Sequence, residues 1–298
     1  MNAIINLENI SQFNSLRGME TLHPLVSVFE FSKMKLIPEA RAYYGFYCVF
    51  LKEAVCGDLK YGCNYYDYQE GTLVFIAPGQ VVGIGSKPGS IMPKGWGLLF
   101  HPDLIRGTSL GHHIQEYSFF SYEANEALHL SEKERKIIID CLTKIDHELH
   151  QSIDKHSKTL ISNNIELLLN YCMRFYDRQF ITRSLVNRDV LAKFEGLLDD
   201  YFKSELPQKI GLPTVKYCAE NIHLSANYLG DLIKKETGKS PQEHIQLKLM
   251  GLAKEKIFDR TRTVSEIAYE LGFKHRQHFS RLFKNETGYT PNQFRYLN

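Results

Sequence analysis

The sequence predicts an α+β protein of two domains: a β-rich N-terminal domain that ends in a pair of helices, then an all-α C-terminal domain. Between residues 43 and 105, short apolar and aromatic segments alternate with Gly and Pro turns, which is typical of a small antiparallel barrel or sandwich. After about residue 130, apolar residues recur at steps of three and four, the period of helices. Near the C-terminus the motif ETG-x-[ST]-P occurs twice, each time after a basic amphipathic segment, which indicates an internal repeat.

The bulk composition is that of a globular protein. The 298 residues suit two domains better than one, and 43% of them are hydrophobic and 23% charged. No apolar run approaches the length of a membrane span, and the N-terminus lacks the pattern of a signal peptide. The six cysteines show no metal-ligand spacing, so we expect reduced thiols in a cytoplasmic protein without a membrane partner.

Positive charge is concentrated toward the C-terminus. The whole chain has a net charge of +2, but residues 209–298 hold 15 Lys and Arg against 9 Asp and Glu. The preceding 208 residues hold 21 against 25. A basic C-terminal domain favours a polyanionic partner.

The N-terminal domain is expected over residues 1–182, with strands between about 20 and 110 and helices between about 131 and 180. Segments such as 72–78 (TLVFIAP) and 96–100 (WGLLF) have the length and apolar composition of strands. Ser131 and Glu134 predict a capping box at the start of the first helix of the pair.

Each helix of that pair carries one apolar stripe at helical period. The stripes can pack against the β domain of the same chain, or they can form the interface of a homodimer, and the sequence leaves both open. The stripe residues are Ile138, Leu142, Ile145, Leu149, Ile161, Ile165, Leu168 and Phe175.

A polar segment, residues 183–188, is the predicted linker, and residues 189–298 are the predicted C-terminal domain. An amphipathic helix is expected over 190–202. A loop is expected over 204–213, because that segment holds two prolines and a glycine.

Two helix-turn-helix patterns make up the repeat, over about 214–238 and about 263–288. Each begins with a helix that carries a small residue, Ala219 or Ala268, where a second helix can cross closely. A joining helix over about 241–259 is expected to fix the spacing of the two copies. Its predicted buried stripe is Leu247, Met250, Ala253 and Ile257.

The turn between the two helices of each copy also has local signals. In the second copy Gly272 suits a left-handed position after the first helix, and Phe273 is expected to fill the core between the helices. In the first copy His223 takes the place of that glycine, and Ser225 is expected to cap the next helix.

The outward face of the second helix in each copy is the candidate DNA-reading surface. Arg pairs with guanine, Gln and Asn pair with adenine, Asp can accept from cytosine, and Lys contacts phosphate. The candidate residues are Ser225, Asn227, Asp231, Lys234, Lys274, Arg276, Gln277, His278, Ser280, Arg281 and Lys284. Two such helices joined rigidly could enter adjacent major grooves about 34 Å apart.

At these residues the sequence resembles the C-terminal DNA-binding domain of AraC/XylS-type transcription regulators. The motifs that carry the resemblance are Ile267-Ala268, Gly272-Phe273, Phe279-Ser280-Arg281, Phe283-Lys284, Thr287-Gly288, Thr290-Pro291 and Phe294-Arg295. The first copy departs from the family at Gly230 and Asp231, which leaves its base reading open. The resemblance implies a dimeric bacterial regulator of promoter DNA, acting as an activator that contacts RNA polymerase.

The N-terminal half is similar, more loosely, to the cupin-like regulatory domain of the same family, over residues 70–80 and 95–111. Such a domain implies control by a small-molecule effector or by dimerisation, and barrel mouths favour pockets. The candidate pocket residues are the aromatic side chains Tyr44, Phe46, Tyr66, Tyr68 and Trp96.

Neither a metal site nor a catalytic site is expected, and no cofactor is implied. Residues 43–80 contain no histidine, and adjacent His112 and His113 would point opposite ways in an extended chain. Nucleophile-elbow, zinc-protease and phosphate-loop motifs are absent from the sequence. An enzyme is therefore not predicted.

Two other readings stay open on sequence alone. The chain could be a cupin-type binding protein or enzyme whose helical tail contacts another protein, a reading that clustered metal ligands would favour. It could also be a DNA-alkyl-transfer protein, but none of the six cysteines has the polar His/Glu or metal setting that this chemistry needs.

Overall fold

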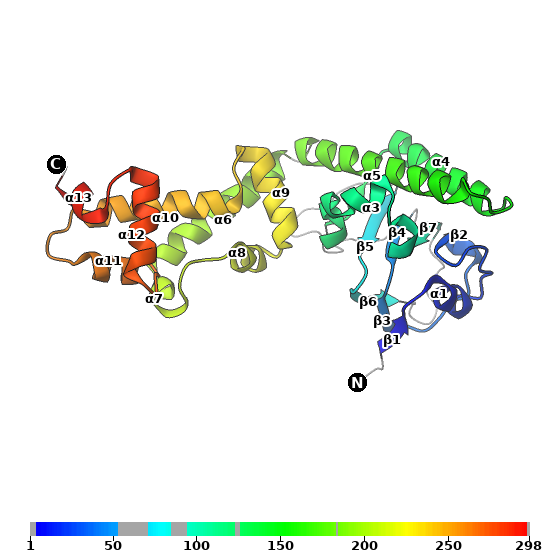
Figure 1. Cartoon of the computed structure of the whole chain (residues 1–298), viewed down its shortest axis with the longest axis horizontal. Helices are drawn as coiled ribbons and strands as arrows, with labels where there is room; N and C mark the ends of the chain where they lie inside the picture. The colour runs from blue at the N-terminus through cyan, green and yellow to red at the C-terminus, as the bar shows by residue number, and fades with distance from the viewer. Residues whose placement is uncertain (1–3, 53–70, 85–93, 123–125, 183, 297–298) are drawn as a thin grey trace. The chain divides into compact units, whose positions relative to one another are not determined.

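The chain folds into two compact units, Met1–Thr182 and Arg183–Asn298. The computed structural model describes residues 4–52, 71–84, 94–122, 126–182 and 184–296. The described strands all lie in the first unit, and the described elements of the second are all helices (Figure 1). The predicted order of a β-rich region followed by an all-helical region is confirmed.

Two sheets form the β-rich part of the first unit. The smaller has the order β1-β3-β6, with strands Ile4–Leu7, Ala40–Tyr44 and Val81–Ile84. The larger has the order β2-β7-β4-β5-β8, with strands Val26–Glu30, Gly95–Phe100, Tyr47–Lys52, Thr72–Ile76 and Leu128–His129.

One strand pair differs from the antiparallel arrangement expected from the sequence. Strand β1 runs parallel to β3, whereas the other paired strands are antiparallel. Parallel neighbours need a crossover connection, and here helix α1 (Ile10–Leu16) and strand β2 lie between the two strands in the chain. The apolar run Leu98–Phe100 of β7 is fully buried.

Short helical segments connect strands of the first unit. The 3₁₀ turn η1 (Phe31–Lys33) lies between β2 and β3. Between β7 and β8 lie helices α2 (Pro102–Ile105) and α3 (Ser109–His113) and the 3₁₀ turns η2 (Ile114–Glu116) and η3 (Ser118–Ser121).

The helix pair consists of α4 (Glu132–Leu149) and α5 (Ser157–Thr182), which pack side by side and contact strands of the larger sheet (Figure 1). The capping box predicted for α4 is confirmed: the Glu134 amide donates to Ser131 Oγ over 3.4 Å, and the Ser131 amide donates to Glu134 Oε2 over 2.9 Å.

The predicted stripe residues do not form an exposed dimer surface. All of them are buried within the first unit, which is intramolecular packing, because both stripes turn inward: Ile138, Leu142, Ile145, Leu149, Ile161, Ile165, Leu168 and Phe175.

The second unit begins with a helix where a linker was expected. Helix α6 spans Ser184–Lys203, so most of the predicted linker 183–188 is helical. The polar residue Asn187 is buried and donates to Glu236 Oε1 over 2.9 Å. Its polarity therefore serves a tertiary contact rather than a solvated connection.

A short helix also replaces part of the predicted loop 204–213. Helix α7 spans Leu206–Ile210, with Pro207 in its first turn. Proline is tolerated there because the amides of the first turn have no partner within a helix.

The remaining helices follow the predicted repeat. The first helix-turn-helix contains α8 (Val215–Ile222) and α9 (Ala226–Thr237), and the second contains α11 (Val264–Glu270) and α12 (Arg276–Thr287). Helix α10 (Pro241–Ile257) joins the two copies, and α13 (Pro291–Arg295) follows the second. Figure 1 shows α9 and α12 near opposite ends of α10, which at 17 residues is about 25 Å long.

The buried stripe of α10 differs from the predicted one at one position. Leu247 is 49% exposed, and Ile245 and Leu249 are buried instead, along with Met250, Ala253 and Ile257. Successive steps of three fall short of a full turn and drift around the helix, so Leu247 lies well away from Ala253 on the helix surface.

Candidate nucleic-acid interface

The first helix-turn-helix is fixed by caps and by one strained residue. Helix α8 ends at His223, which has φ 62° and is the one non-glycine residue with positive φ in the described part of the chain. The Leu224 amide donates to the Ala219 oxygen over 3.0 Å, which closes the turn. Ser225 Oγ then accepts from the Tyr228 amide over 3.1 Å and caps α9.

Replacing His223 with glycine should stabilise the C-terminal unit. A left-handed backbone costs an L-residue roughly 1–2 kcal/mol, partly offset by the entropy that glycine loses on folding. We expect His223→Gly to raise the unfolding free energy by about 1 kcal/mol in denaturant titrations. The matched control, His223→Ala, keeps the strain and should give no gain. Equal stabilities for the two variants would contradict the prediction.

The second helix-turn-helix uses the glycine turn predicted from its sequence. Thr263 and Glu266 form a capping box at the start of α11, and Gly272 follows the end of that helix with φ 95°. The Phe273 amide donates to the Ala268 oxygen over 2.9 Å. The Phe273 ring is buried and meets Phe279 of α12 edge-on, with ring centroids 5.3 Å apart.

The outward face of α12 collects the predicted reading residues. Phe279 and Phe283 are fully buried, so the opposite side of the helix faces solvent. Ser280 is half-buried. The exposed residues at the start of α12 and on its outer face are Lys274, Arg276, Gln277, His278, Arg281 and Lys284.

The cationic groups of this face are available for a ligand. In the part of the chain that the structure describes, the side chains of Arg276, Arg281 and Lys284 have no recorded ion pair or hydrogen bond. Other basic residues of the same copy have structural partners instead: Lys256 and Arg262 both pair with Glu270, and Arg295 Nε donates to the Ile257 oxygen at the end of α10 over 2.7 Å.

The outward face of α9 is less suited to base reading. Asn227 and Lys234 are exposed, and Asp231 is half-buried. Ser225 already holds the helix cap with its hydroxyl. Gly230 presents no side chain, and a Cβ added there would meet nothing within 4 Å. A larger side chain would therefore fit at this position, and the face lacks one only because residue 230 is glycine.

The repeated motif ETG-x-[ST]-P closes one helix and starts the next. In both copies the Thr hydroxyl donates to a carbonyl of the preceding turn, over 2.8 Å from Thr237 and 2.7 Å from Thr287. The glycines that follow have φ of 75° and 79°, a left-handed conformation that ends a helix without Cβ strain. The Ser or Thr then caps the next helix in a capping box, and Pro begins it.

The Glu of each motif ties its recognition helix to a helix earlier in the chain. Asn187 on α6 donates to Glu236 over 2.9 Å, and Gln246 on α10 donates to Glu286 over 2.7 Å. The sequence does not predict these positioning contacts, because each joins residues on two different helices.

A pair of glycines holds the second copy against α7. A Cβ on Gly272 would lie 2.9 Å from the carbonyl carbon of Gly211 and 3.0 Å from the Pro207 oxygen. The Gly211 oxygen also accepts a hydrogen bond of 2.8 Å from the Tyr201 hydroxyl. The sequence predicts only that Gly272 ends a helix. The structure shows that glycine is also needed there because the backbone of Gly211 lies so close.

The predicted effector residues of the first unit do not gather in one described cavity. Tyr44 and Phe46 are 2% and 0% exposed and pack in the core with Phe13 and Cys48, because their strand and turn face inward. Trp96 is half-buried on β7. Tyr66 and Tyr68 lie outside the described residues.

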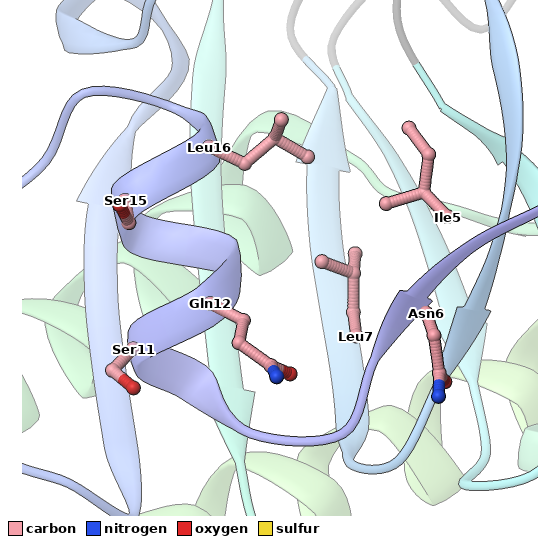
Figure 2. A pocket seen from close by; sticks show the side chains of 7 residues that line it. All are labelled: Ile5, Asn6, Leu7, Ser11, Gln12, Ser15 and Leu16. Atoms are coloured by element: carbon pink, nitrogen blue, oxygen red, sulfur yellow. The ribbon is translucent and has the colours of Figure 1, made fainter.

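The described residues of the first unit line surface hollows of ligand size. One, of about 580 Å³, lies between α1 and β1 and has Ile5, Leu7 and Leu16 in its walls (Figure 2). Another, of about 330 Å³, is lined by aromatic and proline residues around Tyr47. Tyr44 and Phe46 line neither hollow.

The described part of the chain has neither a cluster of metal ligands nor a helix that could span a membrane. Within it, no group of three or more His, Cys, Asp or Glu side chains could hold a metal ion. None of the described helices is long and apolar enough to cross a membrane. The four described cysteines are buried free thiols, and burial raises the pKa of the Cys218 thiol to about 11.

The C-terminal unit is similar in sequence to known proteins. Residues 218–296 match the model of a helix-turn-helix domain family, HTH_18. The chain is 34% identical over 95 residues to YobQ of Bacillus subtilis, an uncharacterized HTH-type transcriptional regulator, covering 32% of this chain and 38% of YobQ. It is 28% identical over 133 residues to the HTH-type transcriptional activator RhaS of Salmonella paratyphi B, covering 44% of this chain and 45% of RhaS.

The match thus spans less than half of either relative. Among solved structures, the C-terminal domain of the two-component response regulator yesN from Fusobacterium nucleatum is 25% identical. It covers 34% of this chain and 93% of that one with a TM-score of 0.31, which is too low to support a statement about fold. The motif residues, the repeated helix-turn-helix geometry and the sequence relatives agree that the C-terminal unit contains a helix-turn-helix domain similar to those of HTH-type transcription regulators.

Proposed function

We propose that the whole chain is a sequence-specific, DNA-binding transcription regulator of the AraC type, and not an enzyme. The observation that carries the proposal is the outward face of α12, where Arg276, Gln277 and Arg281 are exposed on a helix held by Phe279 and Phe283. Guanidinium and amide groups on an exposed helix are what major-groove edges bind.

The wider reading face is part of the same proposal. Lys and Arg supply salt-dependent phosphate affinity, while the Arg and Gln residues of α12 supply most of the specificity. The proposed DNA contacts are Ser225, Asn227, Asp231, Lys234, Lys274, Arg276, Gln277, His278, Ser280, Arg281 and Lys284.

In this proposal residues 1–182 regulate and residues 189–298 bind promoter DNA in the cytoplasm. Activation through RNA polymerase is the mode we favour, because the family resemblance and the activator RhaS point the same way. Control by a small molecule or by dimerisation would act through the first unit.

Selection of DNA from a random pool by the full chain, at low and near-physiological salt, tests the proposal. An enriched site with two half-elements about one helical turn apart would support reading by both copies. A single short element would mean that α12 alone reads bases, as the bare Gly230 on α9 suggests. No enrichment at either salt, for the full chain or for residues 184–298, which keep all of α6, would contradict it.

We also propose that the protein is a homodimer, through the outer face of α5 rather than the buried stripes. Leu160, Leu167 and Ile181 are exposed large apolar residues spaced seven and fourteen apart, so they share one face of the helix. A contact with a second copy would remove this apolar area from water.

Charge introduced on this face should separate the subunits. We expect Leu160→Glu with Leu167→Glu to weaken dimerisation at least tenfold in sedimentation experiments, since both carboxylates would be desolvated in the interface. Met173→Glu is the matched control, because Met173 is equally exposed but lies on another side of α5. Dimers of unchanged strength in the double variant would exclude this face.

A further inference from the structure

The hollow around Tyr47 has the features of a small-molecule site. Its volume of about 330 Å³ is at the lower end for ligand pockets. Its walls come from β4, from the turn after β5 and from the segment that runs from α2 through η3. The side chains that matter are Tyr47, Pro78, Pro102, Gln115, Tyr117 and Phe120.

The aromatic wall of this hollow is rigid. The Tyr47 ring stacks on buried Phe100 with centroids 4.8 Å apart and an interplanar angle of 14°. It meets buried Phe120 edge-on at 4.9 Å. One ring of the wall is thus held from two sides, so little side-chain entropy would be lost when a ligand packs against it.

Polar groups in the hollow are available and uncharged. The Tyr47 hydroxyl has no hydrogen-bond partner recorded among the described residues, and burial raises its pKa, so it stays a neutral donor. The Gln115 amide is exposed nearby. Within the described chain, no Lys, Arg, His, Asp or Glu lines the hollow.

The hollow beside α1 lacks these features. Three of its polar side chains already bind local groups: Asn6 donates to Glu8, Ser11 donates to Asn9, and Gln12 Oε1 accepts from the Glu8 and Asn9 amides. No aromatic ring lines it, as Figure 2 shows for its seven residues.

We propose that the Tyr47 hollow binds a small uncharged molecule with a flat apolar or aromatic body and one hydroxyl or carbonyl group, and that this ligand regulates the dimer through α5. The flat body stacks between the aromatic and proline side chains, and the polar group pairs with the Tyr47 hydroxyl or the Gln115 amide.

Two contacts connect the hollow to α5. The Tyr117 hydroxyl donates to Asn170 Oδ1 over 2.9 Å, and Asn170 lies on the outer face of α5, three residues after Leu167. Phe120 packs on Phe75 at 5.5 Å, and Phe75 packs on Tyr176 of α5 at 6.2 Å. A ligand that moves Tyr117 therefore acts on the proposed dimer face. Regulation of the dimer rests on the proposed homodimer, whereas binding of the ligand to the hollow does not.

Saturation-transfer NMR with the full chain tests ligand binding without DNA. The probes are phenol and indole, with benzoate and benzylammonium as charged controls. We expect the neutral probes to bind with dissociation constants of about 1 mM and the charged ones far more weakly. Tyr47→Ala should weaken the neutral probes about tenfold. Tyr47→Phe should weaken phenol more than it weakens benzene, a further probe that has no polar group. Gln12→Ala, in the other hollow, is the matched control.

Absence of neutral-probe binding, or binding that Tyr47→Phe and Tyr47→Ala leave unchanged, would overturn the site. Regulation is tested by the dimer dissociation constant with and without the tightest probe. A shift of at least threefold is expected, and Asn170→Ala should abolish the shift while leaving probe binding intact. A probe that binds without moving the dimer constant would overturn the coupling alone, and a failure of DNA selection would affect neither result.

Discussion

Gly272→Ala is expected to destabilise the C-terminal unit by about 3 kcal/mol, the largest effect of any single substitution that we predict. Two causes add at this position. An L-residue is strained at φ 95°, and the new Cβ would sit 2.9 to 3.1 Å from the backbone of Gly211 and Pro207. Because those neighbours are backbone atoms, they cannot move aside as the end of a side chain can.

Gly288→Ala is the matched control that separates strain from crowding. Gly288 also has positive φ, at 79°, but a Cβ there meets nothing within 4 Å. We expect it to cost only about 1 kcal/mol. Denaturant titration, with hydrogen exchange of α7 and α11, measures both variants. Equal losses would show that the approach of Gly211 to Gly272 contributes nothing to stability.

Arg281→Ala is expected to weaken binding to the selected DNA site by roughly 1–3 kcal/mol and to relax its preference at one base pair. Arg281 is exposed on the outer face of α12 and has no recorded intramolecular partner in the described chain, so the folded state should not depend on it. The measurement is the affinity for the selected site and for all single-base changes of that site.

Lys284→Ala and Lys209→Ala distinguish base reading from charge. Lys284 lies on the same helix, so its loss should weaken binding about equally across sequences and lower the salt slope by about one. Lys209 on α7 pairs with Glu205 over 2.7 Å, and its loss should change binding little. If Arg281→Ala behaved like Lys284→Ala, with unchanged selectivity, its role in base reading would be wrong.

Interactions close in the chain made much of the second unit predictable. The capping boxes, the left-handed Gly272 and the period of the helices depend on residues within one or two turns of each other. The candidate reading face was predictable for the same reason. The apolar residues of α12 lie on one side of the helix, so the opposite side faces solvent.

Contacts between distant residues were not predictable in this way. The polar sequence at the start of α6 predicts a linker. The hydrogen bond from Asn187 to Glu236 cannot be predicted from it, because the two residues are far apart in the chain. The sequence pattern predicts that Leu247 is buried and does not predict burial of Leu249. In the structure Leu247 is exposed and Leu249 is buried, because the neighbours of α10 pack on a different side of the helix. An amphipathic pattern shows that a face will be covered, but not by what.

Local sequence patterns were enough to predict two helix-turn-helix copies, the helix that joins them and the side chains that α12 offers to a ligand. The burial of Tyr44 and Phe46, the inward-facing stripes of α4 and α5, and the close approach of Gly211 to Gly272 became clear only in the folded chain. Caps and helical periods depend on neighbouring residues, whereas burial and close backbone approach depend on partners that folding brings from elsewhere in the chain.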